Sequence, residues 1–141
     1  MSDFPTSQIF LTIISAWGVA KAVKSLIRLE NGWKFKDIFQ PGDFPSEHTA
    51  FVAGLFFATA FGTSWEPVVT SIAAVVAIIV MYDATHVRYQ TELHAKLLNK
   101  IDQTMKILKE PLKESHGHSI LEVLGGVLVA LIVSLVSYYV L

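Results

Sequence analysis

Histidines and carboxylates recur at the points where polar segments of this chain meet apolar ones. The segment PSEHTA places Ser46, Glu47 and His48 directly before an apolar run, and GHSILEV places His118 and Glu122 at the start of another. Imidazole can act as a nucleophile or as a proton donor and acceptor near neutral pH. Ionisable side chains at the ends of membrane spans are costly, so they are functional candidates by default.

The spacing of these residues suggests specific contacts. His118 and Glu122 are four residues apart, so on one helix face the carboxylate can bind one ring nitrogen and determine which nitrogen is free. Asp83 and Arg88, in MYDATHVRY, can pair in a similar way. A structural interpretation remains open, in which these residues only neutralise each other. Ser46 and Glu47 also suit the N-cap and first turn of a helix.

The composition determines the class of protein. The 141 residues are 52% hydrophobic and 16% charged, with a mean hydropathy of +0.50. The net charge of -1 gives no reason to expect nucleic acid as a partner. The absence of cysteine excludes disulfides, thiol catalysis and cysteine-based zinc sites. Because MSDFPTSQ lacks a basic signal-peptide region, we expect the first apolar run to be retained in a small integral membrane protein.

Apolar runs predict the elements that position these residues. We expect a single all-α membrane domain over residues 1–141, a bundle with about four transmembrane helices, at about 7–27, 49–64, 68–82 and 120–141. A full crossing needs about 20 residues, so the second and third spans are short. Buried helices of a soluble protein are the alternative for those two.

A different helix is predicted at about 89–110. Its apolar residues recur at steps of three and four and form one stripe, consisting of Leu93, Leu97, Leu98, Ile101, Met105 and Leu108. Lysines occupy other faces, and Pro111 ends the pattern. Such an amphipathic helix can lie in the membrane interface or pair with a partner helix, which leaves homo-oligomerisation open.

Charge predicts the orientation. If the four spans alternate, the ends near Lys24, His48, Asp83 and His118 share one side with every Lys and Arg of the chain. The positive-inside rule assigns that side to the cytoplasm and both termini to the outside. We therefore expect a protein of the plasma (inner) membrane whose site faces the cytoplasm.

Four segments resemble the motifs of a known family. PSEHTA, YDATHVR, LNKI and LKESHGHSILEVLGG are similar to motifs of the divergent type-2 phosphatidic-acid phosphatase family, which is related to acid phosphatases and vanadium-dependent haloperoxidases. That family typically shows PSSHSA, YDAxxVR and LKExxGHxxxEVxxG. The resemblance extends from about Ala20 into the last apolar run, and it implies hydrolysis of a phosphate ester at a membrane.

The resemblance also implies roles. In the wider superfamily the second histidine is the nucleophile and the first a general acid. His118 would attack phosphorus, with Glu122 where the superfamily has Asp. His48 would protonate the leaving alkoxide, and Ser46 would donate a hydrogen bond to a phosphoryl oxygen.

Further residues would bind or support the phosphate. The cations Lys24, Arg88 and Lys113 would neutralise its charge. Asp83 would orient Arg88 or a histidine, or bind a metal ion, and His116 adds a second imidazole beside His118. The expected ligands are a lipid phosphate substrate and membrane lipids, with no cofactor and no metal.

The sequence departs from the family pattern at several positions. Glu47 replaces the small residue usual between Ser and His, and Leu112 stands where the superfamily has an arginine, with Lys113 adjacent. No K-x6-R-P motif lies upstream. Two alternatives to a metal-independent phosphatase therefore remain: a non-catalytic lipid-phosphate binding or transport protein, and a metal-assisted phosphatase. His86 and His94 are interpreted as ordinary polar residues.

Overall fold

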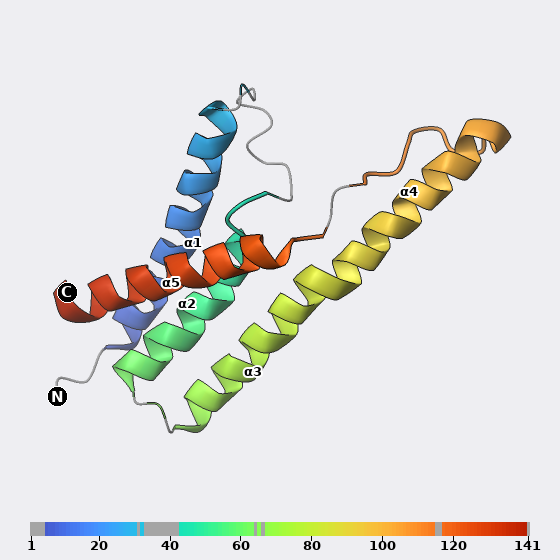
Figure 1. Cartoon of the computed structure of the whole chain (residues 1–141). Helices are drawn as coiled ribbons and strands as arrows, with labels where there is room; N and C mark the ends of the chain where they lie inside the picture. The colour runs from blue at the N-terminus through green and yellow to red at the C-terminus, as the bar shows by residue number, and fades with distance from the viewer. Residues whose placement is uncertain are drawn as a thin grey trace.

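The computed structural model of the chain describes residues 5–30, 32, 43–63, 65, 67–114 and 117–140. All regular secondary structure in these residues is helical, which confirms the predicted all-α class. The helices are α1 (Thr6–Glu30), α2 (Glu47–Gly62), α3 (Val68–Tyr82), the π-helix η2 (Asp83–Val87), α4 (Arg88–Met105) and α5 (Ile120–Val140) (Figure 1). Each apolar segment of the sequence thus forms one helix.

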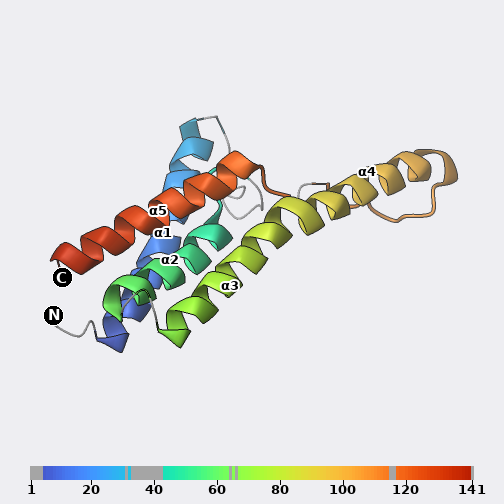
Figure 2. The same ribbon diagram turned by 60° about the horizontal axis from the view of Figure 1, so that its bottom comes forward.

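The bundle is organised around α2. This helix packs against α1, α3 and α5, and α1 also packs against α5 (Figures 1 and 2). At the centre of the α1–α2–α5 contact lie Ala16, Ala53 and Ala130, which are almost completely buried. Small side chains let helix backbones approach closely, as they do in membrane bundles.

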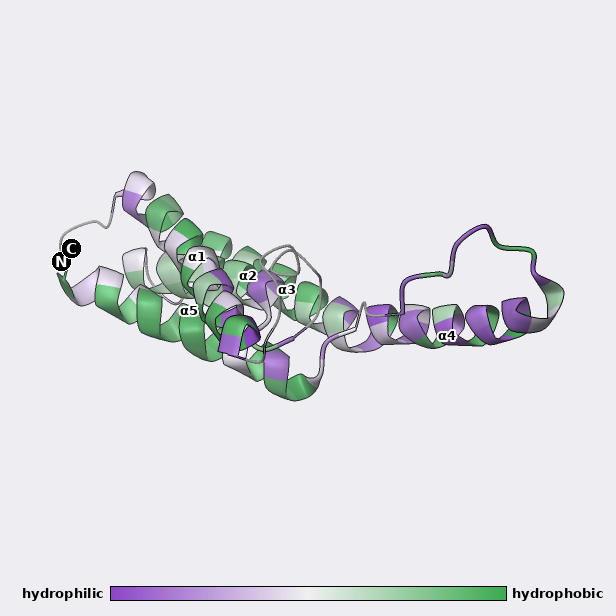
Figure 3. Cartoon of the chain, turned by 90° about the horizontal axis from the view of Figure 1, so that it is seen from above, coloured by the Kyte–Doolittle hydropathy of each residue, from purple (hydrophilic) through white to green (hydrophobic). Residues whose placement is uncertain are grey.

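The outside of the bundle is apolar. Ile72, Ile78 and Leu128 are each more than half exposed, at 59%, 63% and 56%, and hydrophobic residues make up much of the bundle helices (Figure 3). An apolar surface of this extent is unfavourable in water and favourable in lipid. The fold therefore has the surface of a membrane bundle.

Within the described residues, three helical stretches are long and apolar enough to cross a membrane: α1, the continuous helix Val68–Met105, and α5. The second predicted span, at about 49–64, corresponds to α2, which has 16 residues, fewer than the roughly 20 of a full crossing. The structure thus supports three helices of spanning length, together with a short helix at the centre of the bundle.

The helices α3, η2 and α4 form one continuous rod. α4 continues the direction of α3 and projects beyond the bundle (Figures 1 and 2). The π-helix η2 lies at the junction, where Arg88 N–H donates to the carbonyl of Asp83. The predicted amphipathic helix therefore begins beside the site at Arg88 but leads away from it.

The rod ends earlier than the sequence pattern suggests. α4 stops at Met105, not at Glu110, because Lys106 adopts a left-handed conformation with φ 51°. The carboxylate of Asp102 then accepts hydrogen bonds from the N–H groups of Ile107 and Leu108, at 2.6 and 2.7 Å. This turn sends residues 107–114 back along α4.

The two ends of the bundle differ in character. At one end, the start of α1 meets the end of α5, where the Gln8 side chain donates to the carbonyl of Ser137 and the hydroxyls of Thr12 and Ser137 are 2.5 Å apart. Both chain termini lie near this end (Figure 3). The other end combines the start of α2, the start of α5 and η2, and it carries the candidate site.

Candidate functional site

Ser46 joins the starts of α2 and α5. Its hydroxyl oxygen is the N-cap of α2, accepting from Thr49 N–H at 3.3 Å and from the Thr49 hydroxyl at 2.9 Å. Its own N–H donates to the carbonyl of Glu122 at 2.9 Å. Ser46 is fully buried, so the structural role of a cap is the one visible in its contacts, and its predicted contact with phosphate stays a prediction.

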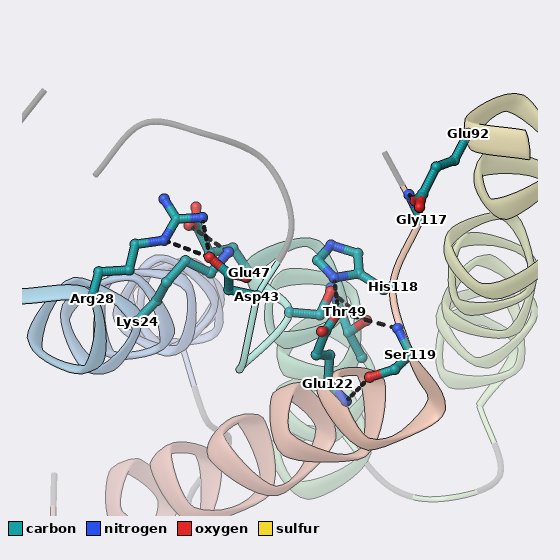
Figure 4. A network of polar contacts seen from close by, with 11 residues as sticks. Lys24, Arg28, Asp43, Glu47, Thr49, Glu92, Gly117, His118, Ser119 and Glu122 are labelled. Atoms are coloured by element: carbon teal, nitrogen blue, oxygen red, sulfur yellow. Dashed lines mark hydrogen bonds and ion pairs between the residues drawn. The ribbon is translucent and has the colours of Figure 1, made fainter. Parts of the chain in front are cut away.

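His118 and Glu122 are in contact at the start of α5. His118 Nδ1 lies 2.7 Å from the Glu122 carboxylate, which also accepts from Ser119 N–H, while the Ser119 hydroxyl accepts from Glu122 N–H (Figure 4). These reciprocal bonds form a capping box. The expected contact is present, but it arises from the turn before the helix and not from one helix face, because α5 begins only at Ile120.

The chain around His118 is also bound to the rod. His118 N–H donates to the carbonyl of Ala84 within η2, at 3.0 Å. Directly before it, a Cβ atom on Gly117 would lie only 3.0 Å from the Cα of Tyr89, so any other residue here would push the chain and the rod slightly apart. The sequence reasoning missed both contacts, although the glycine directly before His118 was a visible signal.

Asp83 and Arg88 pair across η2. Arg88 Nε donates to Asp83 Oδ2 at 2.7 Å, with the two side chains 41% and 38% exposed. Residues five apart come into register in a π-helix, because its backbone hydrogen bonds span five residues. Orienting Arg88, one of the roles considered for Asp83, is therefore the contact seen in the structure.

Two buried cations of α1 are neutralised by carboxylates. Lys24 Nζ lies 3.0 Å from Glu47, with side-chain exposures of 4% and 17%. Arg28 lies 2.8 Å from Asp43, with exposures of 2% and 47% (Figure 4). Glu47, the unusual residue of the first motif, is thus the partner of Lys24. Arg28 was missed, although its position four residues after Lys24 placed it on the same helix face.

His48 lines a cleft at the site end of the bundle. The cleft has a volume of about 500 Å³, and its lining residues are Ile14, Trp17, His48, Phe51, Val52, Val80 and Arg88. Arg88, His118, Glu47 and Lys24 all lie close enough to His48 to act on it electrostatically. The two candidate histidines are therefore at the same end of the bundle.

Not every predicted residue reaches this place. Lys113 is exposed, between Leu112 and Glu114, which are both bound by Asn99. Asn99 is eleven residues beyond Arg88 on α4, about 16 Å at the helical rise. The geometry therefore leaves Lys113 away from the histidines. His116 lies outside the described residues.

The other histidines have ordinary surroundings. His86 stacks on Tyr82 with ring centroids 4.3 Å apart, and His94 is exposed on α4. Within the described part of the chain, no group of three or more His, Asp or Glu side chains is arranged to hold a metal ion. The site thus brings together two imidazoles, those of His48 and His118, and the Glu122 carboxylate that contacts His118. Its cations Lys24, Arg28 and Arg88 are each paired with a carboxylate.

Comparison with known proteins gives these groups a family context. The family model that matches residues 6–133 is described as the divergent PAP2 family. That range covers most of the chain and contains every candidate site residue.

The chain belongs to the divergent PAP2 family. It is also 25% identical, over 154 aligned positions, to YuiD of Bacillus subtilis (strain 168), described as an uncharacterized membrane protein; the alignment covers 99% of this chain and 96% of YuiD. No solved structure matches the chain. Together with the apolar surface, this relative identifies an integral membrane protein.

The contacts give the PAP2-like motifs a structural meaning. PSEHTA caps α2 and supplies Glu47 to Lys24, while SILE forms the capping box of α5. YDATHVR forms η2 with its Asp83–Arg88 pair. The three motifs are then joined by two backbone hydrogen bonds, from Ser46 to Glu122 and from His118 to Ala84.

Proposed function

We propose that the protein is a phosphatase that hydrolyses a lipid phosphate monoester or pyrophosphate through a phosphohistidine at His118. The observation that carries the proposal is the 2.7 Å contact between His118 Nδ1 and Glu122. If Nδ1 carries the proton in that contact, Nε2 presents a lone pair for attack on phosphorus. His48 and Arg88, on the same cleft, supply a proton donor and a positive charge.

The first step transfers the phosphoryl group. Nε2 of His118 forms a bond to phosphorus while the bond from phosphorus to the lipid oxygen breaks. The leaving alkoxide takes a proton from His48, so the lipid departs as an alcohol and His48 becomes neutral. Glu122 stabilises the positive charge that develops on the His118 ring.

The second step regenerates the enzyme. Neutral His48 accepts a proton from water, whose oxygen attacks the phosphorus of the phosphohistidine. The bond between nitrogen and phosphorus breaks, inorganic phosphate leaves, and both histidines return to their starting states. Arg88 stabilises the phosphoryl oxygens during both steps, as guanidinium groups do in phosphoryl transfer.

One observation favours a second candidate function. Because Glu47 already neutralises Lys24, an incoming phosphate must displace this carboxylate or bind beside it. A pocket of this kind would suit a protein that binds or transports lipid phosphate without hydrolysing it.

The orientation forms part of the proposal. We place α1, α2, the rod and α5 as four alternating spans, with short α2 completing its crossing through flanking residues or local thinning of the bilayer. The end that carries the histidines then faces the cytoplasm and both termini face outward, because the basic residues collect at that end. Reporter fusions after Val140 test this, and a cytoplasmic signal there would contradict it.

Phosphate release tests the function directly. The purified protein, in lipid, is given a panel of phosphatidate, diacylglycerol pyrophosphate and polyprenyl phosphate, with and without chelator. We expect release that His118→Ala abolishes and that the control His94→Ala retains. Binding without release would favour the transport alternative. Loss of activity with chelator and its return with a divalent ion would favour the metal-assisted alternative.

A further inference from the structure

The cleft beside His48 is a groove on the outside of the bundle. α1 and α3 both pack against α2 but form no substantial contact with each other. α2 therefore forms the floor of the groove, with Phe51 and Val52, while α1 contributes Ile14 and Trp17 to one wall. Val80 of α3 belongs to the other wall.

The groove opens toward lipid. Ile14, Trp17 and Phe51 line it and are 40%, 37% and 40% exposed. Ile14 and Trp17 lie ten and seven residues before Lys24 on α1, and Phe51 lies one turn after Glu47 on α2. A molecule dissolved in the bilayer can therefore enter the groove from the side.

The groove is polar at one end and apolar elsewhere. His48 and Arg88 are its polar lining residues, and both lie at the site end of their helices. Val80 lies eight residues before Arg88 on the same rod, so the apolar and polar lining residues of the rod are about 12 Å apart along the helix axis. Lys21 Nζ lies 5.0 Å from the centre of the Trp17 ring, a cation–π contact that holds the ring in place.

We infer that this groove binds the hydrocarbon chain of a single-chain lipid phosphate, with the phosphate at His48 and Arg88. Two features support binding of a single hydrocarbon chain. The floor is a single helix, and about 500 Å³ is within the usual range for a pocket that holds one small molecule. The inference rests on the proposed function for the fate of the phosphate, but binding of the chain can be measured separately.

The first experiment blocks the groove. Val80→Trp fills the groove from the α3 side. Ile79→Trp is the matched control, because Ile79 directly precedes Val80, is 61% exposed and does not line the groove. We compare kcat/KM for dodecyl phosphate with that for phenyl phosphate, which has no chain. In Val80→Trp the ratio should fall about ten-fold or more, the effect of losing about two buried methylene groups. In Ile79→Trp it should not change.

The second experiment measures binding without turnover. A dodecylphosphonate with a diazirine at the chain end is photolysed in vesicles that contain the protein, and labelled residues are mapped by mass spectrometry. Labels on Ile14, Trp17 or Val52 that disappear in Val80→Trp and persist in Ile79→Trp support the inference.

The outcomes separate the two proposals. An unchanged kcat/KM ratio in Val80→Trp, or labels only outside the groove, would overturn the inference even if the protein is a phosphatase. If the wild-type protein releases no phosphate from any ester, the proposed function fails. Labelling of the groove by the phosphonate would then still support the inference.

Discussion

The α1–α2–α5 part of the bundle and the α3–η2–α4 rod are built differently. In the first part, small residues bring three helices together, and Lys24 and Arg28 are buried beside carboxylates. The rod packs mainly on α2, with a smaller contact between η2 and α5. In α3 only Thr70, Ala73 and Ala77 are buried, and most side chains of the rod are exposed. Its Asp83–Arg88 pair is also partly exposed.

This difference shows how the candidate site is divided. Both histidines, with Glu122, belong to the tightly packed part, where the capping contacts of α2 and α5 fix their positions. The rod contributes Arg88 and the carbonyl of Ala84. The rate of phosphoryl transfer should therefore depend most on the α1–α2–α5 part. Entry of a ligand into the cleft should depend on how the rod lies against α2.

After the loss of activity expected for His118→Ala, the largest expected effect is loss of the general acid His48 from the packed part. His48→Ala should slow hydrolysis of an alkyl phosphate about 10²- to 10⁴-fold, the usual contribution of a positioned proton donor. An aryl phosphate, whose leaving group needs less protonation, should lose less. Glu122→Gln should lie between His48→Ala and wild type, because the amide keeps a hydrogen bond but carries no charge. The measurement is the initial rate of phosphate release for both esters.

The matched control is His86→Ala, since His86 stacks on Tyr82 away from the cleft lining. It should retain the wild-type rates on both esters. Equal losses on alkyl and aryl phosphates in His48→Ala would show that His48 does not protonate the leaving group.

The next effect compares the ion pairs of the two parts. Glu47→Ala leaves Lys24 buried without a counter-charge and should destabilise the protein by about 3 kcal/mol. Asp83→Ala breaks a partly exposed pair and should cost less than about 1 kcal/mol. Unfolding in mixed micelles by added SDS measures both changes.

A double variant separates charge from packing. Lys24→Met combined with Glu47→Leu removes both charges while keeping similar volumes, so it should recover most of the stability lost in Glu47→Ala. If Glu47→Ala and Asp83→Ala lower the free energy of unfolding by the same amount, burial of the ion pair does not determine how much it contributes to stability.

A smaller effect concerns close packing between α2 and α5. A Cβ atom on Gly126 would lie 2.5 Å from the carbonyl oxygen of Ser46 and 2.8 Å from Thr49 Cβ, whereas one on Gly18 would meet nothing within 4 Å. Gly126→Ala should therefore destabilise the protein by about 1–3 kcal/mol. Gly18→Ala should be neutral or stabilising, because alanine favours a helix. The same SDS titration measures both variants. Equal stability of the two would contradict the prediction, because it would show that the contact between α2 and α5 accommodates a methyl group at position 126.

Much of this arrangement could be predicted from the sequence. Apolar runs predicted the helices, because burial of apolar residues controls where a chain enters lipid, and motif residues predicted that His48 and His118 belong together. The Asp83–Arg88 and His118–Glu122 contacts also followed from short spacings. All of these depend on residues near in sequence or on repeated patterns.

The rest depends on contacts between distant residues. No local pattern indicates that Glu47 pairs with Lys24, that Asp43 pairs with Arg28, or that Ala84 accepts from His118. The stop of α4 at Met105 was equally hidden, because the apolar stripe continues to Leu108 while the Asp102 carboxylate ends the helix locally. The distance of Lys113 from the histidines follows from that early turn.

The smallest effect concerns the segment that returns along α4. Asn99 donates to the carbonyl of Leu112 and to Glu114, and accepts from Leu112 N–H, at 2.7 to 2.8 Å. Because all three contacts are exposed to water, Asn99→Ala should cost only about 1 kcal/mol in total, confined to this segment. Trypsin should then cut faster at Lys106 and Lys109, while phosphate release stays at the wild-type rate. Gln103→Ala, at an exposed position of the same helix, should change neither measurement. A fall in phosphate release on Asn99→Ala would mean that this segment, with Lys113, contributes to the site after all, and that the rod does more than hold Arg88.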